Sequence, residues 1–134
     1  MAENEPVDDL SIPDTDRLFR RVSSNQLVQN EDGSQRPASA VFKTSELSIN
    51  IESLMIEQRR PPEDCLRGYP NEYLTSIVAS DVRSCGCPIV KDTLPPNDPA
   101  HGLVFVKKKD SFANKMAKSL STWVVEPLKV SAEK

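Results

Sequence analysis

The segment 73–106 most constrains the fold, because its apolar residues come in three short runs that are separated by turn-forming residues. β-Branched and aromatic side chains dominate these runs, which are Tyr73–Ala79, Pro88–Val90 and Leu103–Val106. Runs this short and of this composition favour strands over helices. Between the first two runs, Ser80 suits the cap of one helical turn and Gly86 its left-handed end. The centre of the chain therefore predicts a strand, a short helix, a strand, a proline-rich loop and a strand.

Further strands are predicted in the N-terminal half. Residues 16–22 read as a strand without a clean apolar face, which would lie at a sheet edge or carry an arginine that points into a cleft. An Asp-Gly pair at Asp32 predicts a hairpin turn between arms at 26–28 and 38–43. Residues Glu46–Ile51 alternate polar and apolar side chains and give the clearest half-buried strand of the chain.

Three helical segments complete the pattern. Residues 52–60 suit a short helix that the Pro61-Pro62 pair stops. Residues 62–67 suit a second short helix, with Pro62 in its first turn. Residues 111–123 carry apolar side chains at helical spacing, which predicts one amphipathic helix. The fold class expected is α+β: a small, mostly antiparallel sheet of five or six short strands, packed by this C-terminal helix and one or two shorter ones.

Length and composition predict one domain with two loose ends. The chain has 134 residues, of which 37% are apolar, and 11 prolines against 4 glycines. Residues 1–15 are acidic and are expected to be a disordered tail, residues 16–126 to form a single domain, and residues 127–134 to fray. No apolar run is long enough to span a bilayer, so we expect no membrane partner.

The three cysteines and the single histidine do not predict a metal site. Cys85 and Cys87 are separated by one residue, whereas structural zinc sites usually take cysteines two to four residues apart. Cys65 and His101 would have to complete the site from elsewhere in the chain. We therefore expect no metal and no cofactor. An odd number of cysteines, with no basic and apolar leader, favours reduced thiols and a cytoplasmic location.

His101 is the strongest single candidate for catalysis. It ends a proline-rich loop and precedes a strand, a position where functional groups gather, and Asp92 or Asp98 could orient its ring. The alternative is a histidine that hydrogen-bonds the backbone and closes its loop. Arg20 and Arg21 could bind an anion such as phosphate, with Ser39 as a further donor, or they could form surface ion pairs.

A group of lysines near the C-terminus is a second candidate site. We call Lys107, Lys108, Lys109, Lys115 and Lys118 the lysine surface. Such a cluster could contact the phosphates of a nucleic acid, with the acidic tail competing for the same surface. No aromatic side chains interleave with these lysines, however, as they usually do in single-strand binding sites, so a solvated helix face is the alternative.

Several short motifs, taken in order, resemble a scattered family of small uncharacterised bacterial proteins. They are Asp16-x-Leu18-Phe19-Arg20-Arg21, Ser39-Ala40-Val41-Phe42, Leu47-Ser48-Ile49 and Asp98-Pro99-Ala100-His101. This resemblance implies no particular activity. A fainter one is to toxins of the RES type, in the ADP-ribosyltransferase class, which also place an arginine on an early strand and a serine on a later one. The chain lacks the glycine-rich segment and the late catalytic glutamate of those toxins.

Three functions follow as expectations. The first is a non-enzymatic binding or adaptor protein that acts with a protein partner, because no paired catalytic motif is present. The second is association with nucleic acid through the lysine surface. The third is an enzyme that handles a nucleotide or NAD, with His101, Arg20, Arg21 and Ser39 converging on one site.

Overall fold

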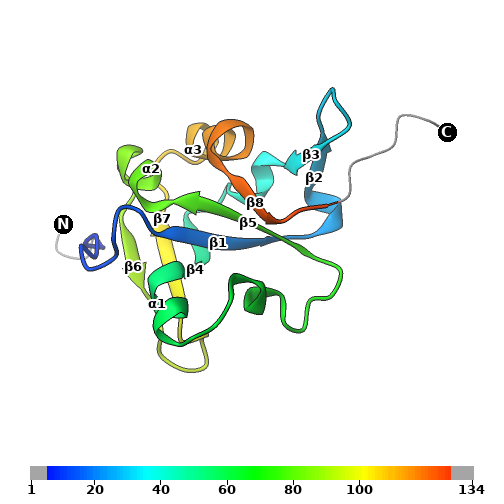
Figure 1. Cartoon of the computed structure of the whole chain (residues 1–134). Coiled ribbons are helices and arrows are strands. Elements are labelled where there is room, and N and C mark those ends of the chain that lie inside the picture. The colour runs from blue at the N-terminus through cyan, green and yellow to red at the C-terminus, as the bar shows by residue number, and fades with distance from the viewer. Residues whose placement is uncertain (1–5, 128–134) are drawn as a thin grey trace.

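The computed structural model describes residues 6–127 and has the predicted α+β architecture (Figure 1). An antiparallel sheet of six strands has the order β6-β7-β4-β1-β5-β8, and β2 and β3 form a separate two-stranded sheet. Three α-helices accompany the sheets within the described residues. The predicted fold class is therefore confirmed.

The strands are β1 (Arg17–Val22), β2 (Leu27–Gln29), β3 (Gln35–Pro37), β4 (Glu46–Ile51), β5 (Tyr73–Val78), β6 (Ile89–Lys91), β7 (His101–Phe105) and β8 (Thr122–Val125). The helices are α1 (Glu52–Glu57), α2 (Ala79–Ser84) and α3 (Lys109–Lys115), and α3 continues as a π-helical turn, Met116–Leu120. Short 3-10 turns occupy Ser24–Gln26, Ser39–Val41 and Pro62–Leu66.

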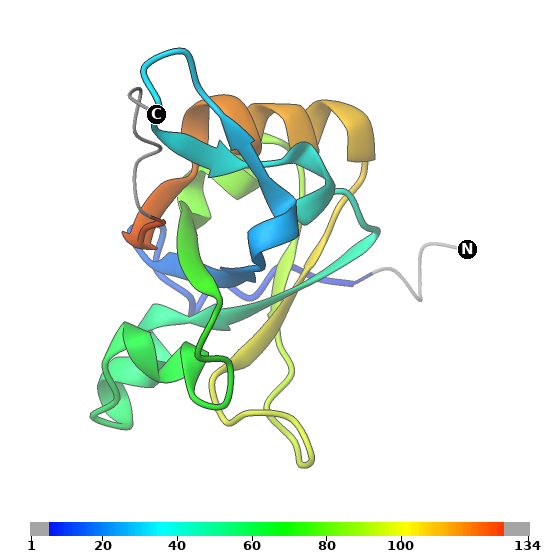
Figure 2. The ribbon, with the colours of Figure 1, turned by 90° about the vertical axis from the view of Figure 1, so that its right-hand side faces the viewer.

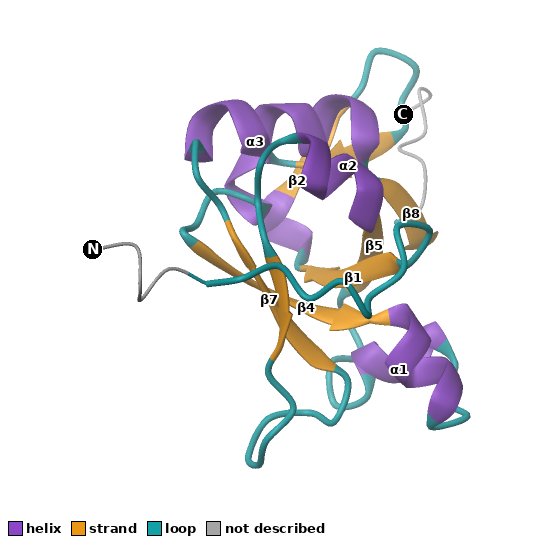
Figure 3. Cartoon of the chain, turned by 90° about the vertical axis from the view of Figure 1, so that its left-hand side faces the viewer, coloured by secondary structure: helices purple, strands orange, loops and turns teal. Residues whose placement is uncertain are grey.

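The large sheet has a hydrophobic core on each face. Helices α2 and α3 lie on one side of the sheet and α1 on the other (Figure 3). The main core contains Leu18, Ile49 and Ile77 from the strands together with Phe112 of α3, all fully or nearly fully buried. The smaller core, on the α1 side, is built from Phe19, Met55, Cys65, Leu74 and Ala100.

The contact between the two central strands, which we call the seam, is short. β1 pairs with β4 through two residue pairs, Leu18 with Ile51 and Phe19 with Asn50. By contrast, β1 pairs with β5 along its whole length, from Arg17 to Val22. Beyond Phe19 the ladder between β1 and β4 ends, and the sheet divides into the half-sheets β6-β7-β4 and β1-β5-β8. Strand β1 is thus central. The sequence left open a position at a sheet edge or an arginine pointing into a cleft, and the edge position is wrong.

The prediction of a disordered tail over residues 1–15 is wrong for residues 8–12, which we call the N-terminal strap. Ile12 is 1% exposed and belongs to the main core. The Asp9 amide donates to the Ile89 carbonyl at 2.8 Å, and Asp8 accepts a hydrogen bond from the Ile89 amide. Asp8 also pairs with Arg83 at 2.9 Å. The strap therefore covers the edge of β6. Asp8 holds it there by its ion pair with Arg83, and Ile12 by packing in the main core. Residues 1–5 and the predicted fraying of 128–134 lie outside the described residues.

Two element boundaries differ from the sequence prediction. The helix predicted over 111–123 ends at Leu120, where the Ser121 amide donates to the Met116 carbonyl, and Trp123 lies on β8. Trp123 pairs with Thr75 of β5, and its indole N–H donates to the Gln35 carbonyl at 2.8 Å. This bond ties β8 to the β2–β3 hairpin, which stands on the α3 side of the sheet (Figure 2).

The second arm of the hairpin is Gln35–Pro37 rather than 38–43, because the turn closes early, with Asn30 donating to the Ser34 carbonyl. Within residues 6–127, none of the helices has the length and apolar character required to cross a membrane.

Candidate ligand-binding cleft

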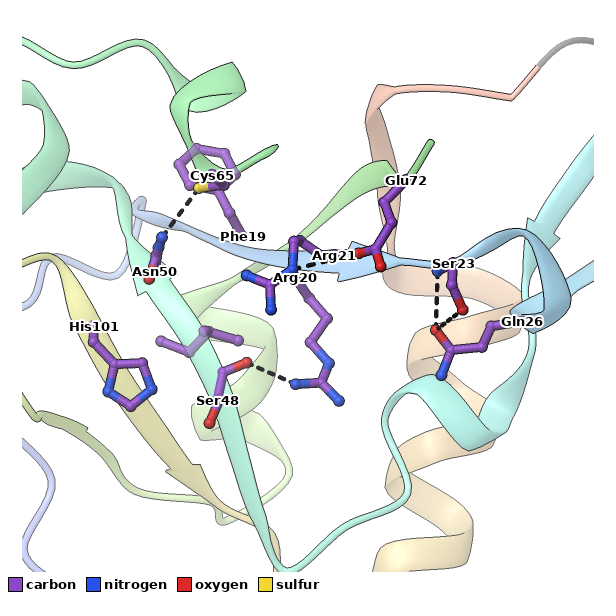
Figure 4. A pocket seen from close by; sticks show the side chains of 11 residues that line it. Phe19, Arg20, Arg21, Ser23, Gln26, Ser48, Asn50, Cys65, Glu72 and His101 are labelled. Carbon is purple, nitrogen blue, oxygen red and sulfur yellow. Dashed lines mark hydrogen bonds and ion pairs between the residues drawn. The ribbon is translucent and has the colours of Figure 1, made fainter. Parts of the chain in front are cut away.

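A cleft opens where β1 and β4 diverge, and we call it the seam cleft (Figure 4). It encloses about 380 Å³. Its walls come from β1, β4, the first residue of β7 and the segments that follow β1 and precede β5. The lining residues are Phe19, Arg20, Arg21, Ser23, Gln26, Ser48, Ile49, Asn50, Cys65, Glu72 and His101.

Arg20 is a half-buried cation without an acidic partner among the described residues. Its Nε donates to the Val41 carbonyl at 3.2 Å and its Nη1 to the Ser48 carbonyl at 3.1 Å. The Ser48 carbonyl belongs to β4 just beyond the end of its pairing with β1, and the Val41 carbonyl belongs to the Ser39–Val41 turn, so the side chain occupies the place where the ladder stops. Burial, and then the like charge of Arg21, lower the pKa of the Arg20 guanidinium. Because arginine stays protonated in proteins, the cleft holds an uncompensated positive charge.

Arg21 is held quite differently from its neighbour. Its guanidinium carbon lies 3.9 Å from the centre of the Tyr69 ring, and its Nε lies 3.4 Å from Glu72 Oε1. The side chain is 42% exposed. The charge of Arg21 is therefore offset by a carboxylate, and its plane is fixed by an aromatic face.

His101 has one ring nitrogen engaged with Asp92. Nδ1 lies 3.1 Å from the Asp92 carbonyl oxygen and 3.2 Å from Asp92 Oδ2. Both neighbours are acceptors, so in the neutral ring Nδ1 carries the proton and Nε2 holds the lone pair. The Asp92 amide also donates to the His101 carbonyl at 2.9 Å. His101 thus closes its loop and, in addition, presents an Nε2 atom for which the described residues supply no hydrogen bond.

A second hollow of about 480 Å³, which we call the outer lobe, adjoins the seam cleft. Arg21, Asn50, Cys65 and His101 line both. Residues of the outer lobe alone are Arg60, Asp64, Arg67, Tyr69 and Asp98.

Arg60 organises the outer lobe. Its guanidinium donates to both oxygens of Asp98, at 2.8 and 2.7 Å, and to Asp64 at 2.6 Å. These bonds join the segment that follows α1 to the Pro62–Leu66 turn and to the loop before His101. Hydrogen bonds from Arg60 lower the pKa of Asp98, so that carboxylate is charged and occupied. Asp98 therefore contacts Arg60, and Asp92 is the acid that orients the His101 ring.

Cys65 lies beneath the junction of the two hollows. It is 7% exposed, and its sulfur accepts a hydrogen bond from Asn50 Nδ2 at 3.2 Å. Burial raises the pKa of the Cys65 thiol, which favours the protonated form and argues against a nucleophilic role. Cys85 and Cys87 lie at the end of α2 and pack with the main core. Residues 6–127 contain no cluster of three or more histidine, cysteine, aspartate or glutamate side chains suited to a metal ion.

The cleft brings together some of the sequence candidates and leaves others out. Arg20, Arg21 and His101 all line it. Ser39 does not, because it begins a 3-10 turn whose contact with Arg20 is made by the Val41 carbonyl. The lysine surface is exposed and lies elsewhere, where Lys108 and Lys115 line a separate hollow of about 270 Å³ with Ser84 and Cys85.

Sequence reasoning did not identify the β4 contribution to the cleft. Ser48 and Asn50 lie on the polar face of the alternating strand 46–51, and both line the cleft with Arg20. The alternation gave a usable signal, since polar side chains on a central strand need a polar environment. Glu72 and Cys65 carried no such signal, because they reach the cleft from turns.

Comparison of the chain with protein-family models, with curated proteins and with solved structures gave no match. The resemblances to small bacterial proteins and to RES-type toxins therefore stay predictions. The chemistry of the seam cleft is what bears on function.

Proposed function

We propose that this protein binds a small phosphate-bearing ligand in the seam cleft, with Arg20 as the main anion contact. One observation carries the proposal. Arg20 is half-buried, yet among the described residues its guanidinium donates hydrogen bonds only to two backbone carbonyl oxygens. Its Nη2 nitrogen has no protein partner there. A phosphate would supply the missing negative charge and accept hydrogen bonds in the planar geometry that guanidinium offers.

His101 adds a group that can move a proton on such a ligand. Its Nδ1 is held by Asp92, and the lone pair on Nε2 makes the neutral ring a general base. The acid-base role belongs to the third expected function, a nucleotide-handling enzyme. A protein partner and a nucleic acid stay predictions, since they concern surfaces outside the cleft.

The binding test compares two substitutions that remove the same charge. We expect wild-type protein to bind ribose 5-phosphate, and Arg20→Met to weaken binding about 10- to 150-fold, since a hydrogen bond to a charged group contributes about 1.5–3 kcal/mol. The control, Arg36→Met, removes an arginine of the β2–β3 hairpin that does not line the cleft. Amide chemical shifts in ¹H–¹⁵N spectra report the binding. Equal affinities of the two variants would contradict the proposal.

The proton-transfer role is tested with His101→Asn. The asparagine amide can replace the Nδ1–H donor toward Asp92, but it has no counterpart of the Nε2 base. We expect a nearly unchanged melting temperature and loss of any turnover found in a panel of nucleotides. Retained turnover would show that His101 serves only to close its loop.

A further inference from the structure

The two adjacent arginines of β1 differ in how their charge is balanced, although both line the seam cleft. Arg20 hydrogen-bonds only to carbonyl oxygens among the described residues. Arg21 has the Glu72 carboxylate 3.4 Å from its Nε and the centre of the Tyr69 ring 3.9 Å from its guanidinium carbon. A second phosphate at Arg21 would compete with Glu72 for the same guanidinium. The two side chains are therefore suited to different parts of one ligand.

Arg21 has the properties of a stacking platform. A guanidinium is planar and weakly hydrated, and it stacks on flat π-systems. Tyr69 fixes one face of this plane, and Glu72 fixes an edge. The side chain is still 42% exposed and lines both the seam cleft and the outer lobe. Nucleic-acid bases stack on the guanidinium planes of arginines.

We infer that the ligand is a nucleotide whose phosphate meets Arg20 and whose base stacks on Arg21 at the mouth of the outer lobe. This inference rests on the proposed function and specifies the ligand class. The platform recognises the π-face of a base rather than its edges, so it favours large rings over small ones and does not select one base sequence. The sugar would then lie between the two arginines, beside Asn50 and His101, which line the junction of the two hollows.

The test compares ribose 5-phosphate with AMP, GMP, CMP and UMP, which add only a base to the same sugar phosphate. With wild-type protein we expect the purine nucleotides to bind roughly 5- to 150-fold more tightly than ribose 5-phosphate, the range for stacking of one base. Arg21→Lys keeps the charge but loses the plane. It should abolish this preference, whereas Arg36→Met, a change outside both hollows, should keep it.

A second measurement needs no variant. The Arg21 Nε–H resonance should move upfield when AMP is added, because the ring current of a stacked base acts along its normal, and it should not do so with ribose 5-phosphate. If ribose 5-phosphate binds through Arg20 but the nucleotides bind no more tightly, or if Arg21→Lys keeps the preference, the inference is overturned and the proposed function stands. If neither ribose 5-phosphate nor any nucleotide binds, both fall.

Discussion

The N-terminal strap makes a quantitative prediction about stability, because Ile12 is the residue that anchors it in the core. Ile12→Ala removes the side chain beyond Cβ from a site that is 1% exposed. At about 0.8 kcal/mol for each buried carbon, the lost transfer free energy is about 2.4 kcal/mol. The cavity left among the core side chains adds to this, so we expect a loss of about 3 kcal/mol in the free energy of unfolding.

Equilibrium unfolding in urea, followed by the fluorescence of Trp123, measures this loss. Leu10→Ala is the matched control, since Leu10 lies two residues away in the same strap and is 83% exposed. We expect that variant to stay within about 0.5 kcal/mol of wild type. If Ile12→Ala were equally harmless, the strap would not be packed on the core, and the acidic N-terminal segment would be the solvated tail that composition suggests.

Two further predictions concern acid stability and the lysine surface. Hydrogen bonds from Arg60 lower the folded-state pKa of Asp98 below its ordinary value of 3.8. The stability that this provides is present above that value and is lost as the pH falls through the lower folded pKa, so the urea midpoint should drop below about pH 4 and drop less in Asp98→Asn. Equal pH profiles of the two proteins would argue against the pairing. For the lysine surface, we expect wild-type protein to be retained on a heparin column at low salt and the Lys108→Gln, Lys115→Gln variant to elute earlier. Co-elution of the two would rule out a polyanion site there.

Local patterns predicted the elements of this fold better than their arrangement. The alternation at Glu46–Ile51 and the short apolar run that begins at Tyr73 gave β4 and β5, because side-chain periodicity is a property of neighbouring residues. The order of the strands depends on contacts between distant residues. The seam between β1 and β4, and with it the cleft, therefore could not be predicted from the sequence.

The errors have physical causes of the same kind. Ile12 is one of a few scattered apolar residues in an acidic segment, and its burial depends on Arg83 being present to pair with the acids. Trp123 continues a helical spacing, but it is drawn into β8 by its pairing with β5 and its bond to Gln35. Arg20 and His101 are residue types whose side chains bind anions and transfer protons, which the sequence alone reveals. Their presence in one cleft follows from the strand order and from the divergence of β1 and β4.

The short seam also determines how the two half-sheets are coupled. β1 and β4 share two residue pairs, whereas β1 shares six with β5 and β4 shares five with β7. Among the ladders of the large sheet, the seam has the fewest residue pairs, so separation of the half-sheets would break few backbone hydrogen bonds and would be opposed mainly by the main core, which both halves share. A ligand that touches Arg20 on β1 and the polar face of β4 cross-links the halves. Its binding would therefore raise the cooperativity of unfolding and slow amide exchange in strands that it never touches.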